Sequence, residues 1–152
     1  GDMIMNTIIS IVGCYILLLA SVVWHEFGHY VFAKTYKFDV VEFSLFVGKQ
    51  IYKKGIFTIR NKPIGAYVAY AYETEDKDKD YLKKRLWITI AGLMFNFILV
   101  EIGLIIGGNI GLDLIIINLG MITLNIIPMG VFNGNKTDAG NAIKLYKEIK
   151  TV

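Results

Sequence analysis

The chain has 152 residues, of which 55% are hydrophobic and only 19% are charged, and its mean hydropathy is +0.51. Soluble domains usually carry about 25% charged residues, so this composition argues against an ordinary soluble domain. The net charge of +3 is too small to indicate nucleic-acid binding, and a single cysteine excludes an internal disulfide. The length is that of one domain, expected over residues 1–152.

The sixteen lysines and arginines fall in two blocks, twelve within residues 34–85 and four within residues 136–150. Apolar runs lie before and between these blocks. The first covers residues 4–24 and is long enough to cross a hydrocarbon core of about 30 Å, which needs roughly 20 residues. It has no basic leading segment and no small-residue cleavage site, which favours a membrane span over a signal peptide.

Three membrane-spanning helices are expected, over about residues 4–33, 81–106 and 112–127, with a tight turn at residues 107–111. Short β-branched and aromatic runs within residues 40–72, separated by turn residues, predict a β-rich loop after the first span. A last helix is expected over residues 139–150. The predicted fold is an all-α polytopic membrane protein with a short β-strand insertion between the first and second spans.

Residues 25–29 read HEFGH, the pattern H-E-x-x-H. On a helix, residues four apart share a face, so His25 and His29 can bind one metal ion while Glu26 lies beside it. In zinc hydrolases such a glutamate takes a proton from water. The alternative, two core histidines packed by chance, is unfavourable because unpaired ionisable groups within a membrane span are costly. The motif therefore predicts a zinc site.

A catalytic zinc ion has three protein ligands and one open position, so a third ligand is needed. Glu101 and Asp113 are expected near the opposite face of the membrane from the two histidines. Asp138, which follows the third span, is the candidate at the right depth. It could equally be the N-cap of the helix over residues 139–150, and the two roles are compatible.

Four segments resemble, in the same order, motifs of the site-2 protease family of intramembrane zinc metalloproteases (peptidase family M50), in a minimal core form. Residues 25–29 match its zinc-binding helix, and residues 63–68 (PIGAYV) resemble its strand P-x-G-G-Y-V. Residues 91–96 (AGLMFN) resemble A-G-P-x-x-N on the next span. Residues 125–128 (NIIP), followed by an aspartate, resemble the N-x-x-P…D-G segment that supplies the third ligand.

The chain departs from the family pattern at the third ligand. The metal-binding aspartate of the family usually lies eight residues after the asparagine of N-x-x-P, and that position is Asn133 here, five residues before Asp138. We expect a longer loop that still delivers Asp138, because an amide is a poor zinc ligand. With Asn133 in the ligand position, the protein would instead be a weakened enzyme or a metal-free relative.

The resemblance implies a protease that hydrolyses peptide bonds of a membrane-embedded or membrane-associated substrate. Its site would consist of Zn²⁺ on His25, His29 and Asp138, with Glu26 as the catalytic base. The substrate helix must unwind to expose its scissile bond, and the strands within residues 40–72 either pair with it by edge addition or are merely structural.

Two asparagines are expected to contact the unwound substrate backbone. These are Asn125 and Asn96, and the alternative for each is an interhelical hydrogen bond that holds the spans together. The expected partners are thus a peptide substrate and the lipid bilayer, with no nucleic acid.

The positive-inside rule places residues 34–85 and 136–152 in the cytoplasm and the turn at residues 107–111 outside. The expected location is a multi-pass protein of a prokaryotic cytoplasmic membrane with its active site towards the cytoplasm. The alternative functions are a catalytically weak or inactive site-2-protease-like adaptor that binds transmembrane segments, or a metal carrier. An intact Glu26 argues against the adaptor, and the lack of a repeated polar face argues against the carrier.

Overall fold

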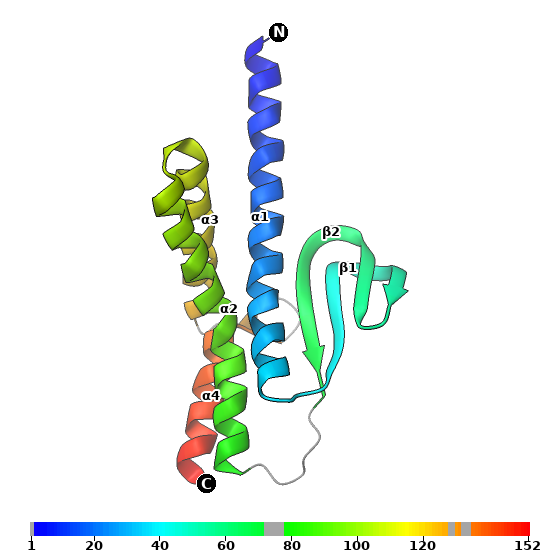
Figure 1. Cartoon of the computed structure of the whole chain (residues 1–152), viewed down its shortest axis with the longest axis vertical. Coiled ribbons are helices and arrows are strands. Elements are labelled where there is room, and N and C mark those ends of the chain that lie inside the picture. The colour runs from blue at the N-terminus through cyan, green and yellow to red at the C-terminus, as the bar shows by residue number, and fades with distance from the viewer. Residues whose placement is uncertain (1, 72–77, 128–129, 132–134) are drawn as a thin grey trace.

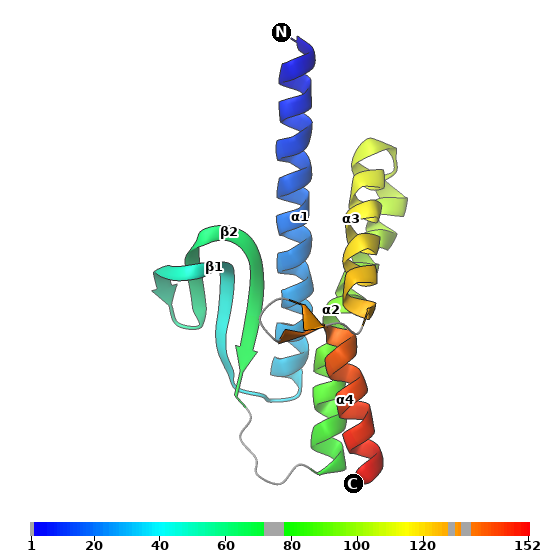
Figure 2. The same ribbon diagram turned by 180° about the vertical axis from the view of Figure 1, so that it is seen from behind.

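The computed structural model describes residues 2–71, 78–127, 130–131 and 135–152, with only the backbone of residues 130, 131, 135 and 136. Figures 1 and 2 show the first helix between a β-hairpin on one side and the other three helices on the opposite side. The elements in chain order are α1 (Asp2–Thr35), β1 (Val40–Lys54), β2 (Phe57–Tyr70), α2 (Lys79–Ile106), α3 (Gly108–Ile126), β3 (Gly130–Val131), β4 (Asn135–Lys136) and α4 (Asp138–Thr151).

The three expected long helices are present as α1, α2 and α3, with 34, 28 and 19 residues, and each is long and apolar enough to cross a membrane. The third begins four residues earlier than predicted, at Gly108. Gly107 and Gly108 have φ values of 64° and 63°, a region that glycine occupies without steric cost. These two residues reverse the chain on their own, so the turn expected over residues 107–111 is shorter than predicted.

The apolar surface of these helices is largely uncovered by the rest of the chain. In the most apolar window of α1, α2 and α3, only 6%, 33% and 17% of the residues are buried. The N-terminal end of α1 extends beyond the other helices (Figures 1 and 2). Exposed apolar surface of this extent must be covered by something other than water.

The β insertion is one bent hairpin rather than several short strands. Its strands have 15 and 14 residues and pair antiparallel, and residues 43–45 of β1 pair with both residues 66–68 and residues 57–59 of β2. Arg60 fixes this bend by donating hydrogen bonds to Glu42 at 2.8 Å and to Ser44 at 3.0 Å. The last part of β2, residues 66–70, forms an edge of the hairpin near α1 (Figure 1).

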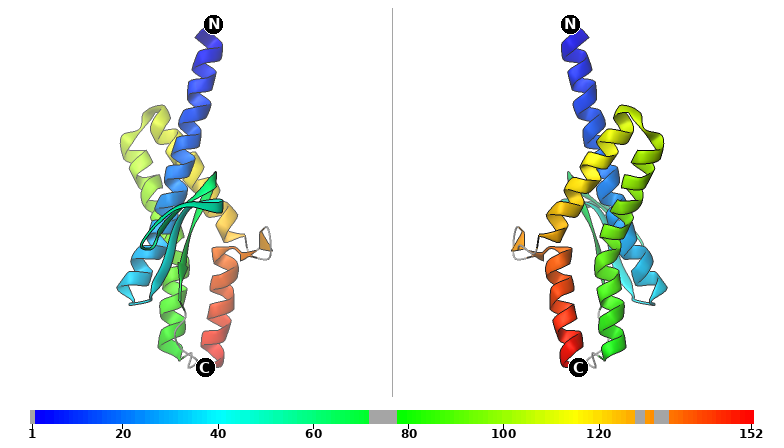
Figure 3. Two further views of the ribbon diagram at one scale, coloured as in Figure 1. Left: turned by 90° about the vertical axis from the view of Figure 1, so that its right-hand side faces the viewer. Right: turned by 90° about the vertical axis from the view of Figure 1, so that its left-hand side faces the viewer.

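The final helix packs along the lower part of α2 (Figure 3), where Leu82, Leu145 and Ile149 form a small buried cluster. Its N-cap is Thr137, whose hydroxyl oxygen accepts a hydrogen bond from the backbone N–H of Gly140 at 3.3 Å. The alternative that Asp138 caps this helix is therefore wrong. Asp138 is the first helical residue, so its carboxylate does not serve as the cap.

Candidate metal centre

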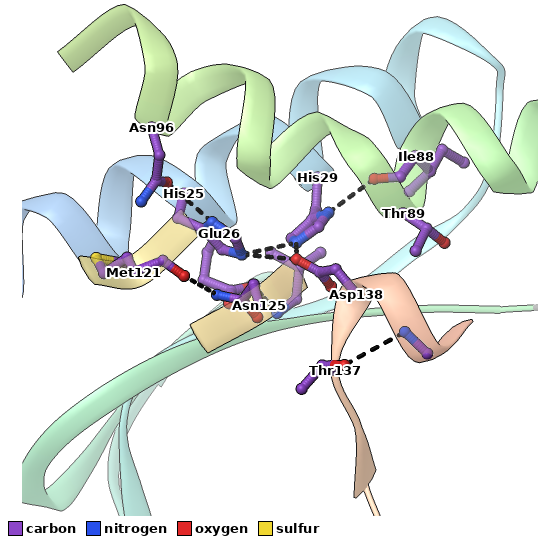
Figure 4. Close-up of polar contacts among 12 residues, drawn as sticks. His25, Glu26, His29, Ile88, Thr89, Asn96, Met121, Asn125, Thr137 and Asp138 are labelled. Carbon is purple, nitrogen blue, oxygen red and sulfur yellow. Dashed lines mark hydrogen bonds and ion pairs between the residues drawn. The ribbon is translucent and has the colours of Figure 1, made fainter. Parts of the chain in front are cut away.

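His25 and His29 lie on the face of α1 that packs against α2, and their Nε2 atoms are 3.2 Å apart. The opposite ring nitrogens are fixed by α2. Nδ1 of His25 lies 2.9 Å from Oδ1 of Asn96, and Nδ1 of His29 lies 2.7 Å from the carbonyl oxygen of Ile88 (Figure 4). Both partners are acceptors, so in the neutral ring each Nδ1 carries the proton and each Nε2 keeps a free lone pair for a metal ion.

Asp138 completes a triangle of ligand atoms with these two imidazoles. Its Oδ2 atom lies 3.1 Å from Nε2 of His25 and 3.6 Å from Nε2 of His29. Tetrahedral zinc with bonds of about 2.0–2.2 Å separates neighbouring ligand atoms by about 3.3–3.6 Å. The three separations of 3.1–3.6 Å therefore fit one zinc ion and leave its fourth position open.

The charge state of Asp138 suits a metal ligand. Burial alone would raise the pKa of its carboxyl group. When the Nε2 atoms of His25 and His29 are protonated, their hydrogen bonds and positive charge lower this pKa further than burial raises it. The net pKa lies below the ordinary value of an aspartate, so the carboxylate is ionised at neutral pH. Metal binding requires this deprotonated form.

Gly92 of α2 provides the space beside the two imidazoles. A Cβ atom at this residue would lie 2.5 Å from Nε2 of His25 and 2.6 Å from Nε2 of His29. Real Cβ atoms do not approach this closely, so any side chain would push into the space where a metal ion would bind. Gly92 was part of the quoted motif on the second span, but the sequence alone did not indicate this role.

Glu26 lies beside the ligand triangle without belonging to it. Its Oε2 atom accepts a hydrogen bond from the backbone N–H of Val68 on β2 at 3.1 Å. Together with His29, Asp138 and Val68, it lines a cavity of about 230 Å³. A carboxylate in this position can accept a proton from a water molecule held at the site, which is the role predicted from the motif. The contact with Val68 was not predicted, since it depends on the packing of the hairpin against α1.

The two asparagines expected to contact substrate occupy different environments. Asn96 is fully buried, and its Oδ1 atom is hydrogen-bonded to Nδ1 of His25. Its Nδ2 atom has no hydrogen-bond partner among the described residues. This geometry matches the interhelical hydrogen bond that the sequence left as an alternative. Asn125, near the end of α3, is half-buried, and its Nδ2 donates to the carbonyl oxygen of Met121 at 3.1 Å (Figure 4). Substrate contact by either residue stays a prediction.

Asn133, the other candidate for the third ligand position, lies outside the residues that the structure describes. Other polar residues of the site were not singled out from the sequence. Tyr67, Tyr70, Thr89 and Asn141 line the same cavity as Glu26. Tyr67 and Tyr70 lie on the edge strand β2 and Asn141 follows Asp138 by three positions on α4, so the placement of their elements around the zinc motif could have indicated them.

Comparison with known proteins agrees with this geometry. The family model of peptidase family M50 matches residues 13–113, and the chain therefore belongs to peptidase family M50. This segment contains the two histidines and Glu26 together with the hairpin, all of α2 and the start of α3.

Two curated relatives carry the name "Putative zinc metalloprotease". The protein from Thermotoga maritima is 34% identical in an alignment 100 residues long, which covers 55% of this chain and 20% of the relative. The protein from Helicobacter pylori is 28% identical in an alignment 158 residues long, which covers 90% of this chain and 44% of the relative. The chain thus spans less than half the length of either relative.

Proposed function

We propose that this protein is a zinc-dependent intramembrane protease that hydrolyses peptide bonds of a membrane-embedded or membrane-associated substrate. The observation that carries the proposal is the triangle of His25, His29 and Asp138, with ligand atoms 3.1–3.6 Å apart and Glu26 beside it. Membership of peptidase family M50 and the names of its relatives support the same chemistry.

The residues of the triangle would hold the metal, and Glu26 would handle the proton. When bound there, a zinc ion supplies Lewis acidity and lowers the pKa of a water molecule to about 7. Glu26 accepts the proton of the water that attacks the scissile carbonyl carbon. It then delivers this proton to the amine that leaves when the C–N bond breaks. The Val68 N–H holds the Glu26 carboxylate beside the triangle before the reaction.

The edge of β2 is suited to hold the substrate in an extended conformation. Residues 66–69 pair with β1 on one side only, and the N–H of Val68 on the other side points to Glu26. A substrate segment unwound from its helix could pair with this edge through main-chain hydrogen bonds, which would bring its peptide carbonyl close to the metal centre. Asn125, at the end of α3, is available to contact the same segment.

The location follows from the three apolar helices and the placement of the basic residues. All sixteen lysines and arginines lie within residues 34–85 and 136–150, so both segments are assigned to the cytoplasm and α1–α3 to the membrane. His25 and His29 lie near the end of α1 that precedes the first basic segment. The site therefore opens towards the cytoplasm, in a multi-pass protein of the cell membrane.

The direct test is reconstitution of the purified full chain into liposomes with a panel of single-span peptides. Mass spectrometry should find cleavage within or next to the span of at least one peptide. Treatment with a chelator should abolish the cleavage, and added Zn²⁺ should restore it. Chelator-resistant cleavage would contradict the metal assignment. Binding of the peptides without any cleavage would favour the inactive adaptor instead.

A further inference from the structure

A second, apolar cavity of about 400 Å³ lies between α1 and the hairpin, separate from the cavity that Glu26 lines. On the helix side its wall is formed by Val23, Phe27 and Tyr30. Their spacing of four and three residues places them on one face of α1. The size lies within the range of pockets that bind small ligands, about 300–1,000 Å³.

The hairpin forms the opposite wall with Phe43, Leu45, Phe57, Thr58 and Ile59. Phe43 pairs with Phe57, and Leu45 pairs with Ile59, so these four side chains project to the same face. Aromatic rings link the two walls. The ring centroids of Tyr30 and Phe43 are 5.9 Å apart, and those of Phe43 and Phe57 are also 5.9 Å apart.

Both walls adjoin the proposed catalytic base. On α1, Glu26 lies between Val23 and Phe27 in sequence and one turn before Tyr30. On the hairpin, Phe43 pairs with Val68, whose N–H donates to the Glu26 carboxylate. Directly opposed residues of paired strands lie about 4.5–5.5 Å apart, so the cavity begins about one strand away from the edge at Val68.

We propose that this cavity is a specificity pocket that receives one bulky apolar side chain, preferably aromatic, from the substrate segment next to the scissile bond. The inference rests on the proposed proteolytic function. A segment that pairs with the β2 edge projects every second side chain over the sheet face that carries Val68 and Phe43. One such side chain enters the cavity, where it packs against Phe43 and Tyr30 with the geometry that aromatic pairs favour.

The test uses single-span substrates with alanine at the three positions on either side of the scissile bond and phenylalanine introduced at one position at a time. For the wild-type protein, kcat/KM should rise at one of these positions by at least about tenfold over the all-alanine substrate, since even small differences in apolar occupancy change kcat/KM about 10–200-fold. The variant Ile59→Trp fills the cavity and should remove most of this preference. The matched control Ile51→Trp, at a residue of the same hairpin that is 66% exposed and outside the cavity wall, should keep it.

Ile59→Ala provides a second, independent variant in case the larger side chain disturbs folding. It enlarges the cavity and should shift the preference at the same position from phenylalanine towards tryptophan. An unchanged preference in both Ile59 variants would overturn the inference. An equal loss of kcat/KM on all substrates would also overturn it, because this is the result expected if a lipid chain occupied the cavity. A wild-type protein that cleaves none of the substrates would instead contradict the proposed function itself.

Discussion

The backbone N–H of Val68 donates a hydrogen bond to the carboxylate of Glu26, at 3.1 Å and across 42 residues of sequence. This bond joins the edge of the hairpin to the residue proposed as general base. The N–H is one that a substrate strand pairing with the edge of β2 could use instead. Substrate binding and the position of the base are therefore coupled at one backbone group.

Asn96 is expected to position His25 for metal binding. Asn96→Leu removes the Oδ1 atom that accepts the hydrogen bond from Nδ1 of His25. The imidazole then loses its fixed tautomer and orientation, so zinc affinity should fall about 10–100-fold. Competition with a chromogenic chelator measures the change. The matched control is Asn118→Leu, since Asn118 is also fully buried but bonds to Ser21 of α1 at 3.1 Å. Wild-type affinity in Asn96→Leu would show that this hydrogen bond only holds the helices together.

Gly92 is expected to tolerate no side chain. The Cβ atom of Gly92→Ala would lie 2.5–2.6 Å from the Nε2 atoms of His25 and His29, so the purified variant should contain little zinc. Gly120→Ala serves as control, because a Cβ atom there meets nothing within 4 Å. Elemental analysis of both proteins gives the answer. Full zinc occupancy in Gly92→Ala would mean that the metal lies elsewhere.

The two candidates for the third ligand position predict opposite results. Asp138→Ala should lose both zinc and cleavage, because its Oδ2 completes the triangle with the two imidazoles. Asn133→Ala should keep its zinc. Metal content and cleavage of the two variants are measured side by side. If Asn133→Ala lost the metal and Asp138→Ala kept it, the spacing usual in the family would hold here as well.

The membrane topology can be tested by cysteine labelling. In a Cys14→Ser background, a cysteine at Asn109 should react with an impermeant reagent added to intact cells. Cysteines at Lys79 and Lys147 should not react until the membrane is opened, because the basic segments are assigned to the cytoplasm. The reverse labelling pattern would place the zinc site near the outer face.

Sequence reasoning predicted the parts of the fold that depend on local patterns. The apolar runs predicted α1, α2 and α3. The spacing of His25 and His29 predicted that the two side chains share one face of a helix and can bind one ion, and their Nε2 atoms are indeed 3.2 Å apart. The early start of α3 was missed because Gly107 and Gly108 reverse the chain more tightly than a typical turn. The N-cap was assigned to Asp138 as an alternative, although the neighbouring Thr137 has an equally suitable side chain.

The features that were not predicted depend on how distant segments pack. The bend of the hairpin is held by Arg60 and Glu42, which are 18 residues apart. The bond between His25 and Asn96 joins residues 71 apart, and the identity of an asparagine does not show whether it contacts a histidine or a substrate. The same holds for the contact of Glu26 with Val68, since a backbone N–H leaves no signal in the sequence.

The most direct test of the central claim is the variant Glu26→Gln, compared with Glu101→Gln, a matched change at an exposed residue of α2. Glutamine keeps the shape of the side chain but cannot accept a proton from water. General acid–base catalysis contributes about 10²–10⁴-fold, so Glu26→Gln should cleave a reconstituted substrate at least about a hundredfold more slowly. Its zinc content should equal that of the wild type, because His25, His29 and Asp138 are unchanged. Cleavage at the wild-type rate would contradict the proposed mechanism, and loss of the zinc would make Glu26 a ligand rather than the base.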